Sequence, residues 1–205
     1  MQTPHLELLF PTPVMVGDVD ITKNELDFIK SSISATIQNG DGATGQYSKD
    51  DHILNNPELK ELKDWALFHI KTYIKSIYKP KYELEPYITQ SWVLLSTKES
   101  SHQAHIHPNS LLSGVIYIST NDDDKITFYN DAPRMLTIET DTYDILNSSE
   151  WWLPTQENKI IIFPSYMSHS VNKVYGDKPR ISLPFNTFIK GKLGGNGKYT
   201  ELILD

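Results

Sequence analysis

Residues 101–119 read SHQAHIHPNSLLSGVIYIS, and this stretch decides how the rest of the chain is interpreted. Three histidines, His102, His105 and His107, lie within six residues, directly before an apolar β-type run at 111–119. Side chains alternate between the faces of a strand, so His105 and His107 point to the same side if their backbone is extended. The two imidazoles could share one metal ion, although an H-x-H pair can also be two polar residues at a strand entrance.

Other short β-type runs flank this stretch on both sides, at 87–89, 91–96, 125–129, 159–163 and 180–189. Strands at this spacing are typical of barrels, so the pattern favours an α+β, mainly β fold. The insertion 130–156 contains Trp151-Trp152-Leu153-Pro154 and exceeds an ordinary connection. We expect it to hold a hairpin or a lid.

Two helices are predicted before these strands, after an extended opening segment at 6–16. The first begins with Thr22 as N-cap and Glu25 three residues later, a capping box. Its apolar positions continue to Ile37, and Asn39-Gly40 stops it before a glycine-rich loop.

The second helix is predicted to begin with Asn56 as cap and Pro57 at its first position, and to end before Pro80. Its apolar residues follow helical spacing on one face, which we expect to be buried: Leu59, Leu62, Ala66, Ile70, Tyr73 and Ile77.

A length of 205 residues, with 39% hydrophobic and 22% charged residues, indicates one globular domain. We divide it into an N-terminal strand with supporting helices (1–80), a β core (81–190) and a C-terminal extension (191–205). The net charge of −7, without a cluster of Lys and Arg, argues against nucleic-acid binding.

Cysteine is absent, so a metal site must use nitrogen and oxygen ligands. The sequence contains no signal-peptide pattern and no apolar run of 18 residues. We therefore expect a soluble, cytoplasmic protein that does not enter a membrane.

His169 is the candidate for a third metal ligand, because it follows the apolar run Ile160 to Pro164, which is typical of a strand entering a turn. A three-point site that leaves coordination positions open suits Fe(II) oxygen chemistry. The acids Asp122, Asp123, Asp124 and Asp131 are expected to be solvated loop residues rather than ligands.

Arg180 and Ser182 are predicted to form a carboxylate clamp, since alternation places both side chains on one face of a strand. The planar fork of arginine binds a carboxylate through two donors, and a hydroxyl two residues later can add a third. A dicarboxylate co-substrate fits this arrangement. The competing interpretation, a surface arginine paired with an acid, is less suited to an apolar run that ends Leu183-Pro184-Phe185.

Four segments together give the chain a resemblance to the Fe(II)/2-oxoglutarate-dependent oxygenase superfamily, and in particular to its uncharacterised bacterial and phage branch. They are Leu9-Phe10-Pro11-Thr12-Pro13-Val14, His105-x-His107-Pro108-Asn109-Ser110-x-x-Ser113-Gly114-Val115-x-Tyr117, Phe163-Pro164-Ser165-x-x-x-His169-x-Val171 and Arg180-Ile181-Ser182-x-x-Phe185-Asn186. The resemblance covers most of the chain. It implies a prolyl-hydroxylase-like double-stranded β-helix, a jelly-roll or cupin-like core, beside the two N-terminal helices.

The resemblance also implies functional roles. His105 and His169 would bind Fe(II), and Arg180 and Ser182 would hold the distal carboxylate of 2-oxoglutarate. Tyr117 resembles a tyrosine that helps to bind this carboxylate in prolyl-hydroxylase-like members, and it can equally be an ordinary core residue. The implied activity is hydroxylation of a small-molecule or peptidyl substrate with O2, releasing succinate and CO2, with no catalytic residue beyond the metal ligands.

His107 departs from the superfamily's usual motif, which has Asp or Glu at this position. It either ligates as a neutral imidazole, which we prefer, or stands aside. This leaves two alternative functions open: a three-histidine cupin-type dioxygenase that does not use 2-oxoglutarate, and a non-catalytic binding module on the same fold. The clamp at Arg180 and Ser182 favours the 2-oxoglutarate-dependent enzyme. The substrate and the oligomeric state do not follow from the sequence.

Overall fold

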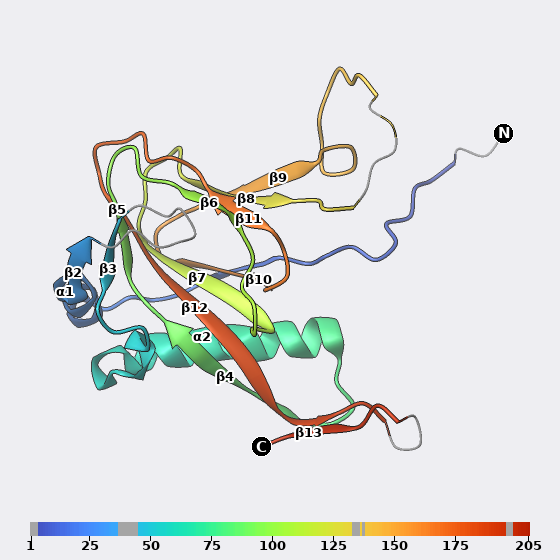
Figure 1. Cartoon of the computed structure of the whole chain (residues 1–205), viewed down its shortest axis with the longest axis horizontal. Coiled ribbons are helices and arrows are strands. Elements are labelled where there is room, and N and C mark those ends of the chain that lie inside the picture. Colours follow the sequence, from blue (N-terminus) through green and yellow to red (C-terminus); the bar gives the residue numbers. More distant parts are fainter. Residues whose placement is uncertain (1–3, 37–44, 133–135, 137, 196–198) are drawn as a thin grey trace.

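The chain folds around two antiparallel sheets, one large and one small (Figure 1). The computed structural model describes residues 4–36, 45–132, 136, 138–195 and 199–205. A buried cluster contains side chains from both sheets, namely Tyr117, Ile126, Phe128, Ile161 and Phe163. The two sheets therefore pack against each other across a shared apolar core.

The large sheet has nine strands and supplies one wall of this core. Its main path runs β1 (Met15–Asp18), β10 (Lys159–Pro164), β7 (Leu112–Ser119), β12 (Arg180–Leu193), β5 (Leu94–Ser96), β3 (Gln46–Ser48) and β2 (Ile33–Thr36). Two further strands pair with the long β12, namely β4 (Leu84–Ser91) and β13 (Leu202–Leu204).

The small sheet has four strands in the order β6 (His102–His105), β11 (His169–Val171), β8 (Lys125–Tyr129) and β9 (Glu150–Pro154). This arrangement is a double-stranded β-helix with two N-terminal helices, so the predicted fold class is confirmed. Most predicted strands appear with similar bounds, and the run 125–129 forms β8 over the whole predicted range.

Helix α1 (Lys23–Ser32) begins as predicted, because Thr22 and Glu25 form a complete capping box. Its predicted continuation to Ile37 is wrong, because Ile33–Thr36 pairs with β3 as strand β2. Ile37, the stop at Asn39-Gly40 and most of the glycine-rich loop lie outside the described residues.

The second helical segment also begins as predicted. Asn56 accepts a hydrogen bond from the Glu58 amide, and the short helices η1 (Ile53–Asn55) and η2 (Pro57–Leu59) lead into α2 (Lys60–Tyr73). The expected inward face of α2 is buried, with one exception. Ile77 is 41% exposed, because the last turns form a π-helix, η3 (Ile74–Tyr78), whose wider turn moves this residue off the buried face and places Ile74 there.

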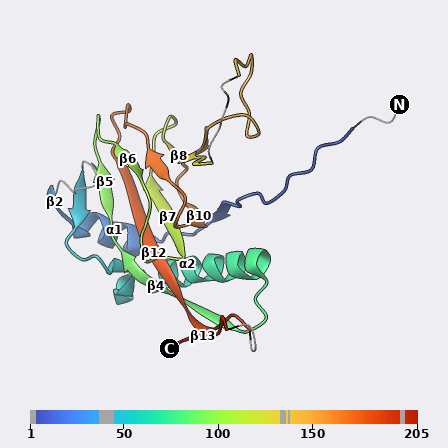
Figure 2. The ribbon, with the colours of Figure 1, turned by 45° about the vertical axis from the view of Figure 1, so that its right-hand side comes forward.

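The helices cover the outer face of the large sheet. A single buried cluster joins apolar residues of both helices to strands of this sheet, including Ile29, Leu62, Ile70, Ile116, Leu183 and Phe185. Helix α2 crosses the sheet in Figures 1 and 2, and its residues contact β4 and β10. The small sheet therefore packs on the opposite face of the large sheet.

Two segments project from this body (Figure 2). The opening segment is extended as predicted, and its residues Leu6, Leu8, Leu9 and Phe10 are exposed. The insertion 130–156 contains strand β9, which pairs with β8. The hairpin is therefore formed by one strand before the insertion and one strand within it. No helix in the described part of the chain is long and apolar enough to cross a membrane.

Candidate metal centre

Three histidines come together where the two sheets meet. His105 ends β6, His107 lies two residues beyond it, and His169 begins β11 directly opposite His105. One ring nitrogen from each histidine lies within 4.8 Å of the others, and no carboxylate belongs to this group within the described residues. The prediction that His105 and His107 point to the same side holds, and His169 joins them from a distant part of the chain.

Hydrogen bonds to the backbone orient two of the rings. Nδ1 of His105 lies 2.8 Å from the Gln103 carbonyl, and Nδ1 of His169 lies 2.9 Å from the Met167 carbonyl. A carbonyl only accepts, so each Nδ1 carries the proton and each Nε2 keeps a lone pair for a ligand. Burial, and then the neighbouring His105, lower the pKa of His169 to about 3. This ring therefore stays neutral, as a metal ligand must.

The spacing and chemistry of this group fit a metal ion. Nε2 of His107 and Nε2 of His169 are 3.3 Å apart. Two imidazoles bound at right angles to one ion, with bonds of about 2.1 Å, would place their nitrogens roughly 3 Å apart. Imidazole suits Fe, Ni, Cu and Zn, and three facial ligands leave positions open for other groups.

Aromatic rings surround the three histidines. The ring of His102 stacks on His105 at 3.9 Å, and the Trp92 ring lies 6.4 Å from that of His107. Phe163 contacts His169 edge-on at 4.6 Å. These rings remove the site from bulk water on several sides.

A row of paired residues crosses the small sheet from the metal group to its edge. His105 is opposite His169, His169 is opposite Phe128, and Phe128 is opposite Trp151 on β9. Directly opposed residues share one face of a sheet, so Trp151 is on the same face as the two histidines. It is 38% exposed, which places it at the rim of the site.

Arg180, Ser182 and Tyr117 occupy the inner face of the large sheet. Ser182 on β12 is directly opposite Tyr117 on β7, and Arg180 is two residues before Ser182 on β12. All three residues are buried. The Tyr117 hydroxyl has no hydrogen-bond partner among the described residues, and burial raises its pKa although Arg180 acts in the opposite direction. A buried hydroxyl without a partner is costly, so this atom is a candidate donor to a polar ligand.

Asp124 corrects one expectation from the sequence. It was expected to be a solvated loop acid, but its side chain is 1% exposed and its Oδ1 lies 2.9 Å from Nη1 of Arg180. The same Nη1 donates to the carbonyl of Asn172 at 3.1 Å. Arg180 is thus held by a buried acid. The sequence does not distinguish Asp124 from the adjacent Asp122 and Asp123, which are exposed.

Several motif residues that carry no predicted role form a hydrogen-bond network beside the histidines. The hydroxyls of Ser113 and Ser165 are 2.8 Å apart, and each bonds onward, Ser113 to the Asn186 side chain and Ser165 to Ser110. The Ser165 carbonyl also accepts from the His107 amide at 3.0 Å. The network ties β7, β12 and the turn after β10 together, and so fixes the backbone of His107.

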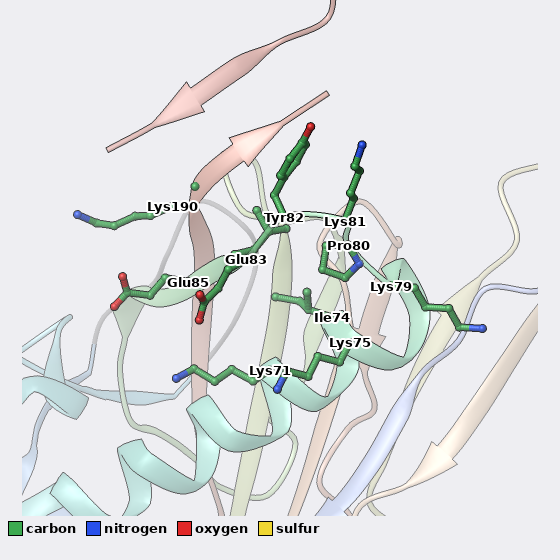
Figure 3. A pocket seen from close by; sticks show the side chains of 12 residues that line it. Lys71, Ile74, Lys75, Lys79, Pro80, Lys81, Tyr82, Glu83, Glu85 and Lys190 are labelled. Atoms are coloured by element: carbon green, nitrogen blue, oxygen red, sulfur yellow. The ribbon is translucent and has the colours of Figure 1, made fainter. Parts of the chain in front are cut away.

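Two other features of the described residues do not compete with this site. Asp50, Asp51 and His52 bring ligand atoms together, but all three are exposed. A hollow of about 960 Å³ beside η3 is lined by five lysines and two glutamates and contains no histidine. In Figure 3 the side chains of Lys79, Lys81 and Lys190 point in different directions, so the hollow does not gather its positive charge on one point.

Residues 90–186 match the model of a protein family described as "Putative 2OG-Fe(II) oxygenase". The match runs from the end of β4 to the middle of β12 and includes all three histidines and the Arg180 region. This match, over just under half of the chain, is consistent with the 2OG-Fe(II) oxygenase superfamily that the sequence resembles. This superfamily uses Fe(II), 2-oxoglutarate and O2, and the three-histidine group is one that could bind metal.

Several solved structures share the fold. The α-ketoglutarate-dependent epimerase SnoN of nogalamycin biosynthesis has a TM-score of 0.60 and 12% identity, with 91% of this chain and 82% of SnoN covered. HygX from Streptomyces hygroscopicus, bound to nickel, 2-oxoglutarate and hygromycin B, has a TM-score of 0.55 and 9% identity, with coverages of 86% and 82%.

A prolyl-4-hydroxylase from Pseudomonas putida is similar over 85% of this chain and 92% of its own, with a TM-score of 0.51 and 11% identity. At these identities the likeness shows the fold alone. The neighbours include an epimerase, a protein with hygromycin B bound and a hydroxylase, so the fold does not select a reaction or a substrate. A search of curated protein sequences finds no match.

Proposed function

We propose that this chain is a 2OG-Fe(II) oxygenase that hydroxylates a small-molecule or peptidyl substrate with release of succinate and CO2. His105, His107 and His169 are the metal ligands in this proposal, and Arg180, Ser182 and Tyr117 bind the distal carboxylate of 2-oxoglutarate. The observation that carries it is the close approach of three ring nitrogens, together with a buried arginine and a buried hydroxyl that has no partner among the described residues.

The spacing of the two groups supports the assignment. Asn172, whose carbonyl holds Arg180, follows His169 by three residues. An extended chain rises about 3.3 Å per residue, so these anchors are at most about 10 Å apart. This separation suits a five-carbon dicarboxylate that reaches the metal with one end and Arg180 with the other.

The residues of the chain have distinct tasks in this reaction. When bound, Fe(II) would supply the activation of O2 that the chemistry requires. The three imidazoles would hold the metal, and the clamp would orient the co-substrate. Phe163, Phe128 and Trp92 exclude water from the site, and Trp151 at the rim is in position to contact the substrate.

Uncoupled turnover tests this proposal without knowledge of the substrate. The iron-loaded protein is incubated with 2-oxoglutarate and O2, and succinate is measured against time. We expect slow succinate formation that His169→Ala abolishes. An iron-loaded protein that forms no succinate, even with a broad substrate mixture, would contradict the proposal.

A second candidate function is a three-histidine dioxygenase that does not use 2-oxoglutarate. The absence of a carboxylate from the metal-ligand group of described residues favours it. It predicts O2 consumption with a substrate in the complete absence of 2-oxoglutarate. The buried Arg180, Ser182 and Tyr117 have no role in that reaction, and for this reason we prefer the first candidate.

A further inference from the structure

Asp124 is a buried acid with every oxygen engaged. Its Oδ1 accepts from Arg180 Nη1 at 2.9 Å, and its Oδ2 accepts from the backbone amide of Asn121 at 2.8 Å and from the Asn121 side chain at 3.3 Å. The turn between β7 and β8 therefore fixes the carboxylate rigidly. It is also the counter-charge that a buried guanidinium needs when no ligand is bound.

The hydrogen bonds of Arg180 leave one edge of its guanidinium available. Arginine has five N–H donors, two of them on Nη1. The two acceptors nearest to Nη1 are the Asp124 carboxylate and the Asn172 carbonyl, and they account for both of its donors. Within the described residues no hydrogen bond leaves Nε or Nη2, and these two atoms form the edge that can bind a carboxylate through two parallel bonds.

Two hydroxyl donors belong to residues near Arg180 in the sheet. Ser182 lies two residues along the same face of β12, and Tyr117 opposite it has the buried hydroxyl without a partner. β7 and β12 are paired strands, so Tyr117 is on the strand next to Arg180, which is bound to Asp124. An incoming carboxylate would meet donors from three side chains, while the positive charge of Arg180 is already shared with Asp124.

We propose that Asp124 is a positioning residue that holds Nη1 of Arg180 and thereby presents the Nε–Nη2 edge to the distal carboxylate of the co-substrate. It rests on the proposed function, because it concerns the same 2-oxoglutarate site. An arginine side chain has considerable rotational freedom, and a fixed acid removes that freedom before the ligand arrives. Asp124 therefore sets the preference of the site for a 2-oxo acid with a second carboxylate.

The test compares two 2-oxo acids by calorimetry on the Mn(II)-loaded protein. 2-Oxoglutarate contacts the metal and Arg180, whereas 2-oxobutyrate has the same metal-binding end and no second carboxylate. For Asp124→Asn we expect the Kd of 2-oxoglutarate to rise about tenfold to a hundredfold, the loss typical when an outer partner of a binding group is removed. The Kd values of 2-oxobutyrate and of Mn(II) should not change.

Asp122→Asn is the matched control, since it removes the same charge from an exposed residue of the same turn. A second variant, Asn121→Ala, keeps both charges and removes the side-chain bonds of Asn121 to Asp124 and to the Lys178 carbonyl, so it should weaken 2-oxoglutarate binding less and in the same direction. Thermal unfolding of each variant shows whether it is folded, and Asn121→Ala carries the test if Asp124→Asn is not.

Two results would overturn the proposal about Asp124 alone. An equal loss of affinity for both 2-oxo acids would mean that Asp124 only maintains the fold. An unchanged or stronger preference for 2-oxoglutarate in Asp124→Asn would mean that the acid competes for Arg180 instead of positioning it. A wild-type protein that binds Mn(II) but does not prefer 2-oxoglutarate would overturn the proposed function as well.

Discussion

Replacing Arg180 by methionine is expected to destabilise the fold as well as the proposed co-substrate site. The side chains of Arg180 and Asp124 are 4% and 1% exposed, so the variant leaves a buried carboxylate without its counter-charge. Removing one partner of a buried ion pair costs about 3–5 kcal/mol. Asn121 still donates two hydrogen bonds to Asp124, so we expect the lower end of this range, about 3 kcal/mol.

Urea unfolding of the metal-free protein measures this cost. The double variant Arg180→Met/Asp124→Asn removes the orphaned charge, and we expect it to recover about 2 kcal/mol of the loss. The control is Lys98→Met, which breaks an exposed ion pair with Asp177 and should cost under about 0.5 kcal/mol. A cost below about 1 kcal/mol for Arg180→Met, or strictly additive effects in the double variant, would refute the buried-pair argument.

Three further substitutions test other parts of the account. Glu25→Ala should lower the free energy of unfolding by about 3 kcal/mol in urea, because the Glu25 carboxylate caps α1 and also accepts from the Leu62 amide of α2. Gly114→Ala should cost about 1–3 kcal/mol in the same assay, because an added Cβ would lie 2.1 Å from the Phe185 ring. Once a substrate is found, Trp151→Ala should raise the KM of that substrate severalfold in a succinate assay and leave the Kd of 2-oxoglutarate unchanged. A changed Kd of 2-oxoglutarate with an unchanged KM of the substrate would contradict the rim position.

Signals confined to a few neighbouring residues were readable from the sequence. The capping box at Thr22 and Glu25 determines where α1 begins, and the alternation of a strand brings His105 and His107 to one side. The end of α1 was not readable, because Ile33–Thr36 pairs with β3 across a separate segment of chain. The spacing of apolar residues within one segment contains no information about pairing with β3.

The same distinction explains the candidate site. His169 was recognised because it follows an apolar strand, but its position opposite His105 depends on the register of β11. Asp124 was missed because its burial depends on Arg180, 56 residues away. Trp151 reaches the rim through β9 pairing with β8, which the length of the insertion did not reveal.

The central claim, that the chain binds 2-oxoglutarate at a three-histidine iron site, is tested most directly by an anaerobic titration. The metal-free protein is titrated with Fe(II) and then with 2-oxoglutarate, and the visible absorption is followed for the weak charge-transfer band of a chelated 2-oxo acid. The account predicts one bound Fe(II), a band that saturates with 2-oxoglutarate, and its loss in His169→Ala. Bound iron that gives no band on addition of 2-oxoglutarate would contradict it.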